Sequence, residues 1–416
     1  MKKRGLALFV CVCLCAAPLL CGCAGAQAQG LEVVYVGGLD STQEPVDNPA
    51  VSQGIYEFSL DIFRELAKGG ENNVFLSPTS IAVALAMTLN GARNETAAQM
   101  QEVLHLQGLD SQDVNEGLFA ISSLLQHADK KVEVRLSNAL WANKDVTIDD
   151  RFIRDNKEYF GAMLANMDFS SPDTVETING WVSESTNGKI AKILEGPIDP
   201  QTILFIMNAI YFEGSWQKPF KASNTKQETF YGLSGDKTVS MMHQSESFRY
   251  GEPGGGQMIH LPYGDGDLGM YVYLPGEGAS VSGTIANLDA KTWDEWTGGL
   301  SESQGSIALP RFRLEYDTYL KNVLTAMGMR DAFSDTDADF TGIAEGASIE
   351  DIRHKAFVDV DEKGTRAAAV TSVEMRATAV EDPQKPFSMT VDRPFLFAIA
   401  QERTGTILFM GSVVDP

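Results

Sequence analysis

The sequence predicts an α+β fold: a single domain in which helices and strands are mixed. Apolar residues recur at helical spacing early in the chain, and a run of ten almost wholly apolar residues near its middle has the length of a buried strand. No repeat and no linker divides the chain after Val51. With 416 residues, of which 44% are hydrophobic, the chain can bury one large core.

The predicted helices begin and end at residues typical of helix caps. Apolar residues spaced three or four apart predict a helix over Ile55–Leu66, which Gly69 terminates. Serine caps a helix and proline is favoured in its first turn, so Ser77-Pro78 opens an apolar helix that continues to Leu89. Two more helices are expected, over Thr96–Leu104 and over Thr177–Ser185.

Three segments read as strands. The run "ILFIMNAIYF", Ile203–Phe212, is too apolar for an edge strand and predicts a strand buried on both faces, with Asn208 as its one polar member. Alternating patterns predict further strands in "SIALPRFRLEY", residues 306–316, and in "GTILFMGSVV", residues 405–414.

Charge and cysteine usage exclude several classes of function. A formal net charge of -23 argues against a nucleic-acid partner, because phosphates require a basic face. All five cysteines lie at or before Cys23. The rest of the chain therefore has neither a disulfide framework nor a catalytic thiol.

The first 22 residues have the parts of an export signal: basic residues 2–4, then an apolar run from Leu6 to Leu20 that is too short for a membrane span. Leu20-Cys21-Gly22-Cys23 resembles a lipoprotein signal, in which Cys23 receives a diacylglycerol before cleavage. Residues 23–50 would then be the lipidated cysteine and a flexible tether. The alternative is ordinary secretion, with cleavage near Ala26 or Ala28.

No constellation typical of an enzyme stands out, and we expect neither a metal nor a cofactor. The five histidines lack ligand spacing, and the chain contains no nucleophile elbow, zinc motif or phosphate loop. Ser223-x-x-Lys226 and Arg403-Thr404-Gly405 approximate motifs of penicillin-recognising acyl enzymes. However, "KASNTKQETF" lacks the apolar periodicity of the buried helix that such a serine requires.

Four long motifs, in order and spacing, resemble the serpins: "FIMNAIYFEGSW", "LPRFRLEY", "HKAFVDVDEKGTRAAAVT" and "MTVDRPFLFAI". The resemblance covers residues 51–416. It implies three β-sheets, eight or nine helices and an exposed reactive loop, here residues 362–391. It also implies suicide inhibition of serine proteases by a monomer: the loop is cut, inserts into the main sheet, and drags the acylated protease across the molecule.

The loop sequence "DEKGTRAAAVTSVEM" fits that role by its own chemistry, since an inserting strand must hide alternate side chains. Every charge from Thr365 onward falls on one face, while the other face begins with small residues: Thr365, Ala367, Ala369 and Thr371. Glu362 and Gly364 precede them in the hinge. An amphipathic edge strand that never moves would also alternate, but the alanine run suits entry better than permanence.

Other positions match serpin residues individually. Four residues match the buried polar cluster under the opening strands, called the shutter: Ser77, Ser80, Asn208 and His354. Three match the breach, where insertion starts: Arg311, Glu362 and Trp216. Arg366 departs from the family, whose inhibitory members usually carry glutamate there, and this puts the rate of insertion in doubt.

The resemblance also predicts the cut. The seventeenth residue counted from Glu362 is Thr378, which makes Thr378-Ala379 the reactive bond, with a shift to Ala379 or Val380 left open by the length of the loop. Small uncharged residues here suit elastase-like or subtilisin-like proteases. A cut after Arg376 would suit trypsin-like enzymes. A non-inhibitory serpin, acting as a carrier, chaperone or surface protein, is the alternative function.

Overall fold

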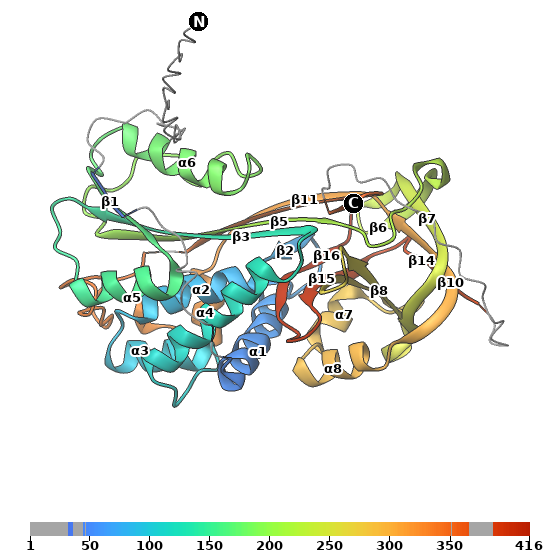
Figure 1. The fold of residues 1–416 in the computed structure, drawn as a ribbon, viewed down its shortest axis with the longest axis horizontal. Helices are drawn as coiled ribbons and strands as arrows, with labels where there is room; N and C mark the ends of the chain where they lie inside the picture. The colour runs from blue at the N-terminus through green and yellow to red at the C-terminus, as the bar shows by residue number, and fades with distance from the viewer. Residues whose placement is uncertain (1–31, 36–44, 46, 351, 366–385) are drawn as a thin grey trace, which may run out of the picture.

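The α+β fold is confirmed by the computed structural model, which describes residues 32–35, 45, 47–350, 352–365 and 386–416 (Figure 1). The described residues contain nine α-helices. Their bounds are α1 Pro49–Leu66, α2 Pro78–Leu89, α3 Asn94–Val103, α4 Ser111–His127, α5 Asp150–Phe160, α6 Asp173–Ser185, α7 Val281–Ala286, α8 Ala290–Gly298 and α9 Lys321–Met327.

The sheet that matters most for function has seven strands, in the order β1-β4-β3-β5-β13-β12-β11. Helix α6 lies over one face of this sheet, and α2 to α5 lie on the other (Figure 1). Its strands are β1 Glu32–Tyr35, β3 Val132–Asn143, β4 Met163–Met167, β5 Leu204–Ser215, β11 Phe312–Tyr319, β12 Arg353–Asp361 and β13 Gly364–Thr365. Strand β1, which falls in the segment expected to be a tether, pairs with β4 and is the edge strand of this sheet.

The two smaller sheets implied by the resemblance are joined into one nine-stranded sheet. The 17-residue strand β7 joins them, since it pairs with β6 and β10 and, at its far end, with β8. The order is β14-β10-β7-β8-β9-β15-β16-β2, with β6 paired to β7. The strands are β2 Val74–Leu76, β6 Lys226–Gly232, β7 Gly235–Gly251, β8 Gln257–Tyr263, β9 Leu268–Leu274, β10 Ser301–Pro310, β14 Phe387–Thr390, β15 Phe395–Gln401 and β16 Ile407–Val413.

One expected strand proved to be two. The alternating segment 306–316 belongs to β10 of the nine-stranded sheet up to Pro310 and to β11 of the seven-stranded sheet from Phe312 onward. Proline has no N–H with which to continue a ladder, so the chain can change sheets here. Arg311 lies between the two strands, at the point where the sheets meet.

The expected helix caps are present. The Asn48 side chain accepts hydrogen bonds from two backbone N–H groups of the first turn of α1, and Ser77 accepts one from Ser80 N–H at the start of α2. Helix α2 is buried along almost its whole length, as its continuous apolar sequence predicts. The helices predicted over Thr96–Leu104 and Thr177–Ser185 are α3 and α6, the latter beginning four residues earlier than expected.

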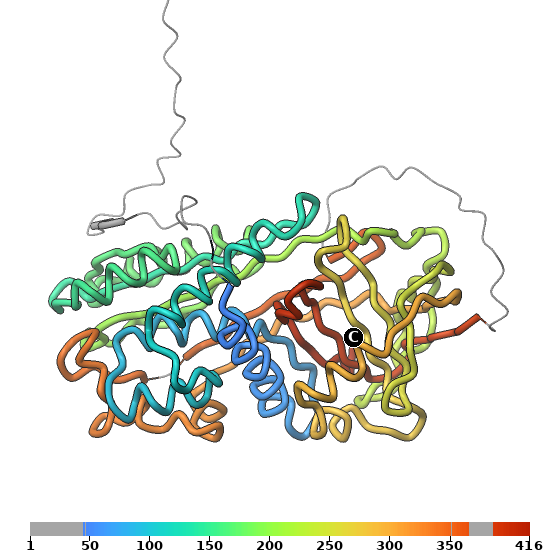
Figure 2. The backbone as a smooth tube through the Cα atoms, turned by 60° about the horizontal axis from the view of Figure 1, so that its bottom comes forward, coloured from blue at the N-terminus to red at the C-terminus, as the bar shows by residue number. Residues whose placement is uncertain are grey.

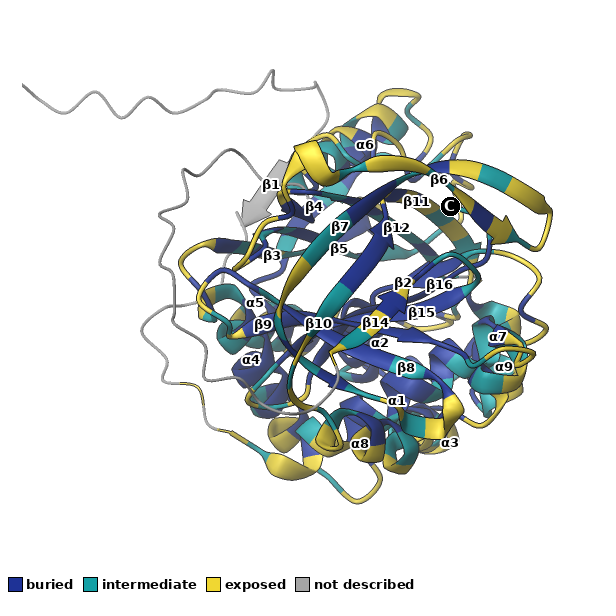
Figure 3. Ribbon diagram, turned by 90° about the vertical axis from the view of Figure 1, so that its right-hand side faces the viewer, coloured by how far each residue is buried: buried dark blue, intermediate teal, exposed yellow. Residues whose placement is uncertain are grey.

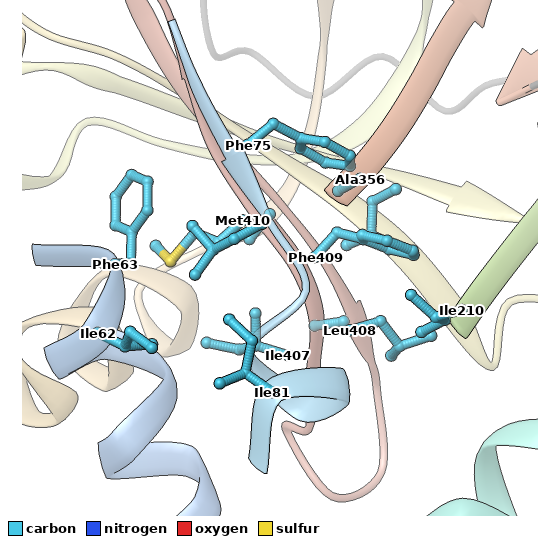
Figure 4. Close-up of a cluster of buried hydrophobic side chains, with 14 of the residues drawn as sticks. Ile62, Phe63, Phe75, Ile81, Ile210, Ala356, Ile407, Leu408, Phe409 and Met410 are labelled. Carbon is cyan, nitrogen blue, oxygen red and sulfur yellow. The ribbon is translucent and has the colours of Figure 1, made fainter. Parts of the chain in front are cut away.

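The core lies between α1, α2 and the two sheets. Figure 2 shows α1, in blue, beside the red strands from the other end of the chain, and Figure 3 shows β15 and β16 buried along their length. In Figure 4, Phe63 of α1, Ile81 of α2 and Ile407 to Met410 of β16 form one cluster with Ile210 of β5 and Ala356 of β12. The apolar core thus reaches the strands that flank β13.

Candidate functional site

The site lies at the centre of the seven-stranded sheet, where the short strand β13 separates β5 from β12. Gly364 and Thr365 pair with Ser215 and Gly214 on one side, and with Asp361 and Val360 on the other. Among the described residues β5 and β12 pair with each other nowhere. A cavity of ≈ 20 Å³ beside Thr365 is lined by residues 210–212 of β5 and 357–359 of β12. The hinge therefore occupies the head of a slot between two strands.

Glycine is required at the first position of β13. Gly364 has a φ of 154°, which disfavours residues with a side chain, and a Cβ there would lie 2.0 Å from the carbonyl oxygen of Gly214. The hinge backbone can approach β5 this closely only because residue 364 is glycine. The glycine itself is visible in the sequence, but its close approach to Gly214 depends on the pairing of β13 with β5.

Trp216 holds the turn that leads into β13. Its backbone N–H donates to the carbonyl oxygen of Lys363 at 2.8 Å, and its indole Nε1 donates to that of Asp361 at 2.9 Å. The indole is 4% exposed and stacks on Tyr263, with ring centroids 4.5 Å apart. Trp216 thereby fixes the chain on both sides of Glu362.

The structure brings Glu362 and Arg311 together. An Arg311 Nη2 atom lies 2.5 Å from a Glu362 carboxylate oxygen, which also accepts a hydrogen bond from Thr225. Burial would raise the pKa of Glu362, but the hydrogen bonds from Arg311 and Thr225 outweigh it and hold the pKa below its ordinary value. Glu362 is therefore a buried, charged anchor at the base of the hinge. No sequence pattern pointed to Thr225.

Tyr263 completes the hinge site, and the sequence did not point to it. Its hydroxyl lies 2.5 Å from Thr365 Oγ1, and Tyr263 and Thr365 are 0% and 3% exposed. Tyr263 is the last residue of β8, in the other sheet. Only the meeting of the two sheets places it under β13.

The four predicted shutter residues lie where the start of α2 meets strands β5 and β12 of the same sheet, in two linked groups. Ser77 N–H donates to His354 Nε2 at 3.2 Å, and Ser80 Oγ donates to the Asn208 side chain. The backbone N–H of Ser80 donates to Ser77 Oγ, and this hydrogen bond in the first turn of α2 joins the two groups.

The second group continues to Asn138, which sequence reasoning missed. Asn208 Nδ2 donates to Asn138 Oδ1 at 2.6 Å, and Asn138 Nδ2 donates to the Phe160 carbonyl oxygen at 2.7 Å. The two asparagines are direct partners in the register of β3 and β5. Asn138 stands beside Ser137 in a strand segment of mixed polarity, "VEVRLSNALWAN", so no local pattern singled it out. The cluster satisfies buried polar groups across three strands and a helix.

His354 makes the stability of this cluster depend on pH. Burial lowers its pKa to about 4, from an ordinary value of 6.5. The unfolded chain takes up this proton below about pH 6.5 and the folded chain only near pH 4. Acidification therefore favours unfolding between these values, by about 3 kcal/mol in all. We expect the free energy of unfolding to fall more steeply with acid in the native protein than in His354→Gln.

Denaturant melts at pH 7.5, 6, 5 and 4 measure the free energy of unfolding of the native protein and of His354→Gln. His127→Gln is the matched control, since His127 is exposed and its Nδ1 bonds to the carbonyl oxygen of Ser123 in the same helix. Equal pH slopes for the native protein and His354→Gln would contradict the assignment.

Several predicted residues lie outside the described ranges: Cys23, Ala367, Ala369, Thr371, Thr378 and Ala379. The acyl-enzyme motif does not have the required setting, because Ser223 is exposed in a three-residue 3-10 turn and Lys226 begins strand β6. Within the described ranges, no group of three or more metal-ligating side chains is placed to hold an ion.

The comparisons with known proteins agree on one family. Residues 53–416 match the model of the family "Serpin (serine protease inhibitor)". An uncharacterized serpin-like protein of Thermococcus kodakarensis is 39% identical over 91% of this chain and 88% of its own length. The leukocyte elastase inhibitor of Bos taurus is 35% identical over 86% of this chain and 97% of its own.

Solved structures give the same result. The crystal structure of a thermophilic serpin, tengpin, in the native state is similar with a TM-score of 0.82 and 29% identity, over 93% of this chain and 100% of that one. A complex of thyroxine-binding globulin with thyroxine is similar with a TM-score of 0.77 and 28% identity, over 88% of this chain and 99% of that one.

Proposed function

The chain belongs to the serpin family, whose members are generally protease inhibitors, and we propose that it inhibits serine proteases as a suicide substrate. The observation that carries this is the placement of β13. The hinge of the reactive loop pairs with β5 on one side and β12 on the other, and these two strands do not pair with each other among the described residues. A strand that continued from Thr365 would enter the main sheet as a new central strand.

The two described ends of the loop lie in different sheets, which explains why a cut is needed. Thr365 is in the seven-stranded sheet, whereas Phe387 begins β14 of the nine-stranded sheet. Strand β14 pairs with β10, and Phe387 stacks on Tyr250 with centroids 3.9 Å apart. The uncut loop is thus held at both ends, and cleavage frees the end that follows Thr365.

The chemistry follows from the proposed cut at Thr378-Ala379. The protease serine oxygen bonds to the carbonyl carbon of residue 378, the peptide bond breaks, and the amino group of residue 379 leaves with a proton. The acyl enzyme is then carried with the inserting loop before water can hydrolyse the ester. The small residues around the cut suit an elastase-like or subtilisin-like pocket, and the likeness to an elastase inhibitor supports this choice.

We expect pancreatic elastase to form a covalent complex with this protein that survives SDS. Mass spectrometry of the complex and of the released peptide gives the cut site in the same experiment. Release of a peptide that begins at Ala379 is expected. Clean cleavage without an adduct, across a range of protease ratios, would place the protein among substrates and favour a non-inhibitory role.

The non-inhibitory alternative rests on one observation, the likeness to thyroxine-binding globulin, whose structure holds a small ligand. A carrier would not need its loop to insert, so the two functions differ in whether cleavage stabilises the fold.

We also propose that the protein is exported and anchored through a lipid on Cys23, with the body as a monomer. No helix in the described part of the chain is long and apolar enough to cross a membrane. Two or three acyl chains would hold the protein durably on a membrane, because each buried methylene contributes about 0.8 kcal/mol.

Cys23→Ser should release the protein from membranes, measured by fractionation and by labelling with a fatty-acid analogue. Label that persists in the variant would contradict the anchor.

A further inference from the structure

The structure shows the hinge in an unexpected state for a loop that has not been cut. Gly364 and Thr365 of the intact chain are already a strand, with a partner on each side. Thr365 is as buried as a core residue, at 3% exposed. The first step of insertion has therefore been taken before any protease acts.

A single buried tyrosine reaches this hinge from the other sheet. Tyr263 lies 0% exposed, with its ring between Trp216, whose centroid is 4.5 Å away, and Phe212, at 5.1 Å. Its hydroxyl has one described partner, Thr365 Oγ1 at 2.5 Å. If the hinge left the sheet, this hydroxyl would be buried without a partner, which is costly.

The sheet makes room for that contact. Gly214 is the β5 partner of Thr365, and a Cβ at Gly214 would lie 3.0 Å from both the Tyr263 and the Phe212 rings. Trp216, which stacks on Tyr263, donates hydrogen bonds to the backbone carbonyl oxygens of Asp361 and Lys363, just before β13. The tyrosine, the tryptophan and the hinge backbone thus form one connected unit.

We propose that Tyr263 is a positioning residue for loop insertion, which holds Thr365 inside the sheet of the uncut chain through a hydrogen bond between their hydroxyl groups. This inference rests on the proposed inhibitory function. It deepens that function by assigning the state from which insertion starts. Insertion after cleavage extends a strand that already exists, so the unfavourable separation of β5 from β12 at this end of the sheet precedes the reaction.

The experiment measures the opening of the hinge directly, by hydrogen exchange of the peptide that contains residues 362–365 in the intact full chain. Tyr263→Phe keeps the stacked ring and removes only the hydroxyl, and Thr365→Val removes its partner at nearly constant shape. We expect each to speed exchange by about 2- to 10-fold, the effect of one net hydrogen bond. The double variant should add nothing further, and Thr365→Ser, which retains a hydroxyl, should behave as the native protein does.

Tyr56→Phe is the matched control, because Tyr56 is buried in α1 and its hydroxyl donates to Asp294 of α8 rather than to a residue of the hinge. The second readout is the ratio of cleaved inhibitor to covalent complex with elastase. This ratio reflects hydrolysis of the acyl enzyme relative to insertion, and it should rise with Tyr263→Phe by up to the same factor while the rate of first attack is unchanged.

The outcomes separate the two proposals. Fast, unprotected exchange of the hinge in the native protein, or an unchanged rate in Tyr263→Phe, would overturn the positioning role even if elastase is inhibited. Absence of any covalent complex would overturn the inhibitory function, while a protected hinge that opens in Tyr263→Phe would leave the hydroxyl contact standing.

Discussion

We expect cutting of the reactive loop to raise the melting temperature of this serpin by roughly 10 °C. A nick in an ordinary surface loop adds chain freedom and is neutral or destabilising. Here the cut frees the segment after Thr365 to continue β13 between β5 and β12. About twelve residues would add ladder hydrogen bonds of about 0.5 to 1.5 kcal/mol each. The ordering cost is of similar size, so burial of the apolar face of the segment provides the net gain.

The structure strengthens this expectation, because the slot already begins at Thr365 and its two sides are not paired with each other in the described residues. The test is a melting curve before and after limited proteolysis, with the cut located by mass spectrometry between Arg376 and Pro383. It does not depend on finding the physiological protease. An unchanged or lower midpoint would show that the loop does not insert, and the trapping mechanism would fall with it.

If the proposed inhibitory function holds, we expect Thr365→Arg to convert the inhibitor into a substrate. Thr365 lies between two strands, 3% exposed, beside a cavity with room for about one water molecule. A guanidinium there has no carboxylate partner in the described lining other than Asp359, and burying it costs several kcal/mol. The hinge would leave the sheet. We expect the yield of covalent complex with elastase to fall at least about 10-fold while cleavage of the loop continues.

Arg366→Glu is the matched control for that variant. Residue 366 lies outside the described ranges, but successive residues of a strand face opposite ways, so its side chain is expected on the outer face. Charge reversal there should leave the complex intact. Thr365→Arg should also lose the rise in melting temperature after cleavage. If the two variants lose inhibition equally, the assignment of inward and outward faces is wrong.

The sequence by itself determined the local structure of this protein. Ser77-Pro78 predicted where α2 begins, and the apolar run around Asn208 predicted an internal strand, because capping and burial depend on residues close in the chain. The long motifs determined the family. They also predicted that Arg311, Trp216 and Glu362 would meet, through the resemblance rather than through any local signal.

Only the tertiary structure decided how distant segments meet. Segment 306–316 reads as one alternating strand, yet Pro310 and Arg311 divide it between two sheets, since alternation records burial and not the identity of the partner strand. The hydroxyl contact of Tyr263 with Thr365 joins residues 102 positions apart, and the amide hydrogen bond from Asn208 to Asn138 joins residues 70 positions apart. Such contacts are fixed by strand register and by the meeting of two sheets, which are properties of the folded chain as a whole.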